Sequence, residues 1–135
     1  MNFISRDTDY AVRALTFMAR AWKKDVVTVD EIVEAEHLPE RFLRRILQKL
    51  AKRKILSSHK GKKGGFSFLK NPGEIKLTDI IEVFQGNVEL TNCLLKGRIC
   101  PNVKTCPLRK RLTKMGQGVD KELRKINIGL LSKEE

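Results

Sequence analysis

The first half of the chain carries apolar residues at helical spacing. Between residues 7 and 22 they recur at steps of three and four, which predicts a helix with one buried face: Ala11, Ala14, Leu15, Met18 and Trp22. Thr28 and Glu31 have the spacing of a capping box, so a second, short helix is predicted from Thr28 to His37. Residues 39–54 predict a third helix, with Pro39 in its first turn. Proline is tolerated there because the N–H that it lacks would have no partner within the helix.

The predicted third helix separates apolar from basic side chains. The set expected to face the core is Phe42, Leu43, Ile46, Leu47 and Leu50, and the basic set is Arg41, Arg44, Arg45, Lys49 and Lys52. Two short helices joined tightly, the second amphipathic in this way, predict a helix-turn-helix. A strand over residues 55–60, a Gly-rich turn over 61–64 and a returning strand over 65–69 then predict a hairpin wing.

The charge of the chain is concentrated in this helix and hairpin. Residues 41–70 hold eleven of the 28 Lys and Arg residues and none of the 16 acidic residues. Almost the whole formal net charge of +12 therefore lies in one ordered stretch. A solvated surface or a solubility tail does not concentrate charge in this way, whereas a surface that binds a polyanion does. DNA is the first candidate.

The last third of the chain predicts two further helices around an irregular segment. Residues 77–84 predict a fourth helix that ends at Gly86, and residues 87–105 show no clear period. From Pro107 a long helix is predicted, with an apolar seam at steps of four and three: Leu108, Leu112, Met115, Val119, Leu123, Ile126 and Leu130. Such a stripe is typical of a coiled coil, so the expected partner is the same helix of a second chain.

Composition argues against several classes of protein. At 135 residues and 41% apolar content the chain fits one domain of ordinary size. No window is apolar enough to span a membrane, and the N-terminus lacks the apolar core of a signal peptide. A cytoplasmic location without disulfides is therefore expected. The sequence also has no nucleotide-binding loop and no Ser/His/Asp set, which argues against an enzyme.

Three cysteines lie just before the last helix. Cys93, Cys100 and Cys106 are separated by six and then five residues. Zinc sites more often begin with two cysteines on one tight turn, whereas wider gaps suit a polynuclear iron–sulfur centre. The spacing alone leaves three alternatives open, which are an iron–sulfur centre, a zinc site, and redox-active or free cysteines.

Several stretches, in this order, match one known family. They are residues 8–14 (TDYAVRA), Phe42, Leu43 and Leu50, the wing residues 58–66 (SHKGKKGGF), the three cysteines and the long last helix. Together they resemble the IscR/NsrR family of iron–sulfur, winged-helix transcriptional regulators nearly from end to end. The resemblance implies a mainly helical fold with a small β-hairpin. Residues 1–86 would form a winged helix-turn-helix domain with its wing at 55–70, residues 87–106 a cluster-binding loop, and residues 107–135 a dimerisation helix and tail.

The resemblance also implies how DNA is bound. A homodimer would place its third helices in successive major grooves of a palindromic double-stranded operator and its wings in minor grooves. Arg41 and Arg45 would read bases, with Arg44 beside them, because Arg can bind guanine through two hydrogen bonds. Lys60 stands where the family usually has Arg. The remaining residues expected at the DNA are Lys49, His59, Lys62, Lys63 and Gly64, of which Lys62 and Lys63 would meet phosphates.

The ligand set departs from one branch of this family. IscR-type members use a His three residues after the last cysteine as the fourth cluster ligand, and this chain has Arg109 there. The gap between the first two cysteines is also one residue longer than the commonest one. NsrR-type members use an Asp near the start of the first helix, supplied by the partner chain, and Asp9 matches it. Asp9 is therefore the expected fourth ligand, with Asp7 and His37 as alternatives; the structural alternative for Asp9 is an acid at a helix N-terminus.

Two functions follow. The first is a transcriptional regulator, expected to be a repressor, whose 2Fe–2S or 4Fe–4S cluster senses nitric oxide, redox state or iron–sulfur status. The second is a cluster-free regulator of the same fold, controlled by thiol oxidation or by a protein partner. Analysis of iron and acid-labile sulfide separates these two.

Overall fold

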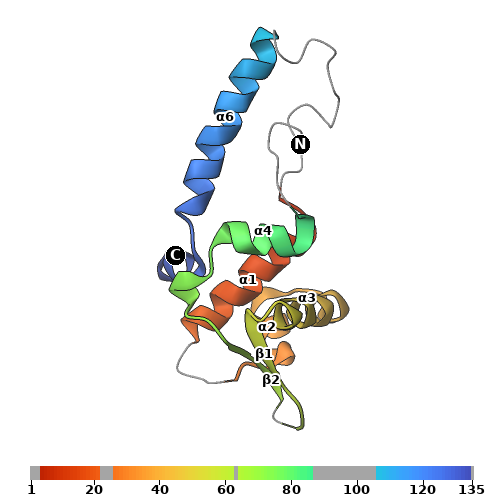
Figure 1. The fold of residues 1–135 in the computed structure, drawn as a ribbon. Helices are drawn as coiled ribbons and strands as arrows, with labels where there is room; N and C mark the ends of the chain where they lie inside the picture. Colours follow the sequence, from red (N-terminus) through yellow and green to blue (C-terminus); the bar gives the residue numbers. More distant parts are fainter. Residues whose placement is uncertain (1–3, 22–25, 63, 87–105, 135) are drawn as a thin grey trace.

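A computed structural model describes residues 4–21, 26–62, 64–86 and 106–134, which form helices around one hairpin (Figure 1). The elements in chain order are α1 (Arg6–Arg20), α2 (Val29–Glu36), α3 (Glu40–Lys52), β1 (Leu56–His59), β2 (Gly65–Phe68), the 3-10 helix η1 (Pro72–Glu74), α4 (Leu77–Gln85), α6 (Pro107–Arg124) and α7 (Ile128–Lys133). The predicted class, a mainly helical winged helix-turn-helix followed by a long helix, is confirmed.

Helix α1 forms the centre of the core and contacts α2, α3, α4 and α7. Its predicted apolar face is buried through Ala11, Ala14, Leu15 and Met18. The Oγ of Ser5 caps the N-terminus by accepting a hydrogen bond from the Thr8 amide. The helix ends at Arg20, two residues before the predicted end at Trp22, which lies outside the described residues.

Helices α2 and α3 form the helix-turn-helix. The predicted capping box is present, since the Thr28 hydroxyl accepts from the Glu31 amide and the Glu31 carboxylate accepts from the Thr28 amide. His37 ends α2 at a positive φ of 54°. Pro39 is the N-cap of α3 rather than a residue of its first turn, and α3 ends two residues early, because Lys54 also has a positive φ, of 61°.

The core face of α3 is narrower than the sequence indicates. Leu43, Ile46, Leu47 and Leu50 are buried, as predicted. Phe42 was expected in the same set, but it is only half-buried and lies beside two guanidinium groups. The difference follows from helix geometry, because Phe42 precedes the buried row by one residue and is turned toward the edge of the apolar face.

The wing is a two-stranded antiparallel hairpin in which Leu56 pairs with Phe68 and His59 pairs with Gly65. A third segment joins it, because the amides and carbonyls of Val27 and Phe66 exchange two hydrogen bonds of 2.9 Å. This contact requires glycine at position 65, where a Cβ atom would lie only 2.3 Å from the Val27 carbonyl oxygen. The hairpin is therefore attached to the strand-like segment before α2, so the wing and the helix-turn-helix form one unit.

The last predicted helix is two helices. α6 ends at Arg124, and the chain then pairs with the segment before α4: the Leu77 amide donates to the Ile126 carbonyl and the Ile128 amide to the Ile75 carbonyl, both at 3.0 Å. The seam predicted to run to Leu130 in one helix is therefore wrong beyond Leu123. Its last members leave α6 because Ile128 is fully buried in the core, and the Asn127 side chain caps a new helix, α7.

Helix α6 extends away from the rest of the fold, whereas α7 packs against α1 and η1 (Figure 1). Only the C-terminal end of α6 reaches α4, where Leu123 and Ile81 form a small buried cluster with Val119 at its edge. Within the described residues, no helix is both long enough and apolar enough to cross a bilayer.

Candidate nucleic-acid interface

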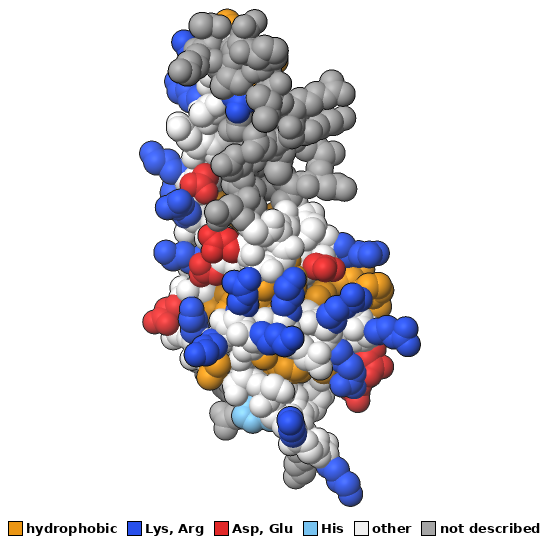
Figure 2. Space-filling view, turned by 45° about the vertical axis from the view of Figure 1, so that its right-hand side comes forward, with side chains coloured by type: hydrophobic (Ala, Val, Ile, Leu, Met, Phe, Trp, Pro, Cys, Tyr) orange, Lys and Arg blue, Asp and Glu red, His pale blue; other side chains and the backbone are white. Residues whose placement is uncertain are grey.

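The polar side of α3 forms an exposed basic face. Arg41, Arg44, Arg45, Lys49 and Lys52 are all exposed, as predicted. Figure 2 shows a band of Lys and Arg side chains across the middle of the molecule, with hydrophobic side chains interspersed among them. The structure thus brings the cations of α3 onto one surface.

The cations of α3 are held in two different ways. Arg44 is paired with Glu40 one turn earlier, with the Glu40 Oε1 atom 2.8 Å from one guanidinium nitrogen and 3.0 Å from Nε. Both side chains are about half exposed, so this pair adds little to stability but partly neutralises Arg44. Arg45 instead lies over the Phe42 ring, 5.1 Å from its centroid, and Lys49 lies over the Phe84 ring of α4 at 5.4 Å.

A further cation joins this face from a distant part of the chain. The guanidinium carbon of Arg6, at the start of α1, lies 5.2 Å from the centroid of the Phe42 ring. Sequence reasoning missed Arg6, because it lies outside the basic stretch and its proximity to α3 depends on how the helices pack. The Phe42–Arg45 contact could have been read from the sequence, since residues three apart are neighbours on a helix.

The wing supplies more polar groups. Ser67 Oγ and His59 Nε2 lie 2.8 Å apart across the hairpin. Lys60 and Lys62 are exposed at its tip, whereas Lys63 lies outside the described residues. Gly64 is required by its surroundings, since a Cβ there would lie 2.5 Å from the His59 carbonyl oxygen.

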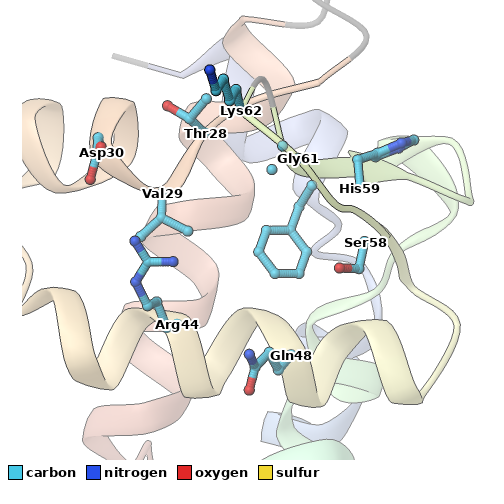
Figure 3. Close-up of a pocket in the computed structure, with 12 residues that line it drawn as sticks. Thr28, Val29, Asp30, Arg44, Gln48, Ser58, His59, Gly61 and Lys62 are labelled. Atoms are coloured by element: carbon cyan, nitrogen blue, oxygen red, sulfur yellow. The ribbon is translucent and has the colours of Figure 1, made fainter.

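An open cleft of about 360 Å³ lies between α3, the start of α2 and the wing (Figure 3). Its lining residues include Arg44 and Gln48 of α3 and His59 and Lys62 of the hairpin. Asp30 also lines it, so the cleft is mixed in charge. Its groups are hydrogen-bond donors and acceptors on an open surface, which suits the backbone of an extended polyanion better than an enclosed small molecule.

The expected cluster ligands are only partly described. Cys93 and Cys100 lie outside the described residues, whereas Cys106 is a free, half-buried cysteine at the N-cap of α6. The Asp9 carboxylate is about half exposed and lies 3.3 Å from Arg13 Nε. The described residues contain no group of three or more His, Cys, Asp or Glu side chains arranged to hold a metal.

The two alternative ligands are separated by the fold. Asp7 is exposed in the first turn of α1, near Asp9. His37 is exposed at the turn between α2 and α3, on the helix-turn-helix itself. Arg109, which replaces the histidine of one family branch, is a half-buried residue in the first turn of α6.

A group of hydrogen bonds that the sequence did not predict fixes the start of α1. Thr8 is fully buried, and its hydroxyl donates to the Gln85 side-chain oxygen at 2.8 Å. The same oxygen accepts from the Ser5 amide at 3.0 Å. Gln85 is the last residue of α4, so this hydrogen-bonded group joins the turn that carries Asp9 to the point where the chain enters the cysteine segment.

The predicted dimer seam has an exposed and a covered part. Leu108 and Met115 are 62% and 59% exposed on α6, and Leu112 is half-buried. Val119 and Leu123 instead contact the cluster around Ile81 in the same chain. On α6 the exposed apolar surface therefore lies in the N-terminal two thirds of the helix, and Leu130 of the seam is 44% exposed on α7.

Comparison with known proteins agrees with this geometry. The sequence profile of the Rrf2 family, described as an iron-dependent transcriptional regulator, matches residues 4–134. A candidate HTH-type transcriptional regulator of Aquifex aeolicus (strain VF5) is 37% identical over 91 residues, which are 67% of this chain and 62% of that protein. The chain therefore spans less than two thirds of the length of that relative.

Solved structures show the same fold. CymR, the global cysteine regulator of B. subtilis, superposes with a TM-score of 0.80 at 20% identity over the whole of both chains. IscR of T. potens superposes with a TM-score of 0.75 at 23% identity, over 98% of this chain and 88% of that one. At these identities the likeness concerns the fold alone.

Proposed function

We propose, since the chain belongs to the Rrf2 family of DNA-binding transcriptional regulators, that it is a homodimeric repressor that binds a palindromic operator. The observation that carries the proposal is the row of exposed cations on α3, which continues onto the wing. Arg41 and Arg45 would read base edges in the major groove, and Lys60 and Lys62 would contact the minor groove and the phosphates. The relatives are named as regulators, which fits a binding protein rather than an enzyme.

The DNA arm of the proposal is tested by binding at several salt concentrations. Duplexes selected from a random pool by the protein itself are compared with scrambled duplexes of the same composition. Binding to the selected duplexes should be tighter, and both affinities should fall steeply with salt, because each phosphate neutralised contributes about −0.9 to the slope of log K against log salt. A protein that selects no sequence from the pool, or whose binding is insensitive to salt, is not the regulator proposed.

Control of this binding would come from an iron–sulfur cluster. We propose that Cys93, Cys100 and Cys106 of one subunit and Asp9 of the partner subunit hold it. The donor chemistry fits, because thiolates are the ligands of such clusters and a hard carboxylate in a thiolate shell forms a weaker, exchangeable bond. Cys106 is only half-buried and the Asp9 carboxylate is half exposed, so both can take part in a site between subunits. When bound, the cluster would supply a centre that reacts with nitric oxide or oxygen.

The cluster arm is tested by iron and acid-labile sulfide analysis of protein purified without oxygen, together with its visible absorption. A cysteine-ligated cluster should give equal iron and sulfide and a visible band that nitric oxide bleaches. Replacing any one of the three cysteines by Ala should abolish the band. Protein with neither iron nor sulfide would refute the cluster arm and leave the DNA arm untouched.

A second mode of control is favoured by the accessible thiol of Cys106. In this alternative the protein binds no cluster, and oxidation of its cysteines or association with another protein controls DNA binding. Such a protein would contain no iron, and its affinity for the operator would change on treatment with peroxide and recover with a thiol reductant. Loss of that response in Cys106→Ser would assign it to this residue.

A further inference from the structure

Phe42 is the unusual residue on the proposed reading helix. Its neighbours Leu43, Ile46 and Leu47 are buried in the core, whereas its own ring stays half-buried at the surface. A half-exposed aromatic side chain adds little to the core. What it does contact is charge, because Arg6 and Arg45 both lie about 5 Å from the ring centroid, at 5.2 and 5.1 Å.

The contact restricts two long side chains. A free Arg samples many rotamers, and ordering it on DNA lowers the affinity that its hydrogen bonds could give. A guanidinium group held over an aromatic face loses part of that freedom beforehand. Phe42 therefore places Arg45 in a restricted orientation before DNA arrives.

Arg6 is held from both sides. Its ring contact fixes the guanidinium end, and the hydrogen bonds of Ser5 and Thr8 with Gln85 fix the backbone of the turn that carries it. Arg6 thus extends the basic face from α3 onto α1, although Arg6 lies more than thirty residues before α3 in the sequence.

We infer that Phe42 is a positioning residue for DNA recognition, which orients Arg45 for base reading and brings Arg6 into the surface that meets phosphates. The inference rests on the proposed DNA-binding function. It assigns the aromatic ring to the specificity of binding rather than to the stability of the core, and it adds one phosphate contact that comes from outside the helix-turn-helix.

The first test compares Phe42→Leu with Phe42→Tyr, using selected and scrambled duplexes. Leu keeps an apolar side chain without a ring, whereas Tyr keeps the ring. In Phe42→Leu the ratio of specific to non-specific affinity should fall about two- to fivefold, the worth of an exposed cation–π contact, whereas Phe42→Tyr should retain it. If Phe42→Leu does not fold by circular dichroism, Phe42→Met, which has a similar volume, takes its place. An unchanged ratio in a folded ring-less variant overturns the inference.

The second test concerns Arg6. Arg6→Gln should weaken binding to selected and scrambled duplexes equally and reduce the salt slope by about one per subunit. Lys133→Gln, which removes an equal charge from the exposed end of α7, is the matched control and should leave the slope unchanged. A slope in Arg6→Gln equal to that of the control would remove Arg6 from the interface.

A third variant separates this inference from the proposed function. Arg45→Gln should relax sequence preference whether or not Phe42 positions the side chain. If Arg45→Gln changes nothing, the assignment of α3 as the reading helix fails. If Arg45→Gln relaxes preference while the ring-less variant does not, the reading helix stands and only the role of Phe42 is refuted.

Discussion

The hydrogen bond from the Thr8 hydroxyl to the Gln85 side-chain oxygen joins α1 to α4, so its removal should lower the free energy of unfolding. Thr8→Val removes the buried hydroxyl and keeps the β-branched shape. The Gln85 oxygen still accepts from the Ser5 amide, and the Ser5 hydroxyl still accepts from the amide of residue 8. The Ser5 hydroxyl, whose Oγ lies 2.9 Å from the Thr8 Oγ1, also loses its hydrogen bond to residue 8. The loss should therefore be that of two neutral hydrogen bonds, about 1–3 kcal/mol in the free energy of unfolding, because the Gln85 oxygen keeps one donor and is not orphaned.

The same helix offers a matched control. Thr16 is half-buried, and its hydroxyl donates to the Val12 carbonyl in its own helix at 2.7 Å. A Thr hydroxyl that bonds a carbonyl one turn back in its own helix adds little to stability. Thr16→Val should therefore change the free energy of unfolding by less than about 0.5 kcal/mol. Both substitutions are buried or half-buried Thr→Val changes in α1, and they differ in whether the hydroxyl bonds another helix.

Urea unfolding followed by circular dichroism, at one fixed protein concentration, measures both variants. From the average unfolding entropy per residue, Thr8→Val should also lower Tm by about 3 °C for each kcal/mol lost. Equal stabilities of Thr8→Val and Thr16→Val would show that the contact between α1 and α4 does not depend on this hydrogen bond. A loss well above about 3 kcal/mol would show instead that a buried group loses its partner.

Four further outcomes follow from the described contacts. Lys62→Ala should weaken binding to all duplexes about equally and flatten the salt slope by about one per subunit, measured by fluorescence anisotropy. The double change Leu108→Lys and Met115→Lys should give a folded monomer by sedimentation equilibrium, and a dimer of unchanged affinity would place the interface elsewhere. Asp9→Ala should keep part of the visible cluster absorption but change its spectrum and its rate of reaction with nitric oxide, and unchanged spectra and rates would move attention to the alternative ligands. Gly65→Ala should destabilise the fold by about 1–3 kcal/mol in urea unfolding, because the added methyl meets the carbonyl of the segment before α2, and wild-type stability would contradict that close approach.

The elements specified by local interactions were predictable. The capping box of α2, the hairpin and its turn, and the buried face of α3 depend on residues close together in the sequence, and each is present. The end of the long helix α6 was not predictable, because the regular apolar spacing continues past Arg124, where the helix ends. The break at Lys125 is caused by pairing with residues 75–77, fifty positions earlier in the chain, and spacing alone carries no information about that partner.

The candidate site divides in the same way. The exposed cations of α3 could be read from helical periodicity. Arg6 and the Thr8–Gln85 hydrogen bond could not, because they depend on α1 and α4 meeting beside α3. The DNA-reading roles and the ligand set remain predictions, and Cys93 and Cys100 lie outside the described residues.

The two non-glycine residues with positive φ in the described part of the chain, His37 and Lys54, flank α3. Each is followed by a buried hydrophobic residue, Leu38 and Ile55, whose place in the core holds its neighbour in a conformation that L-residues avoid. Sliding or rotation of α3 within its domain would therefore move both buried residues out of the core. If the proposed homodimer switches between DNA-bound and released states, we expect the change to lie in the angle and spacing of its two domains, and the helical repeat of DNA sets which spacings allow both to bind.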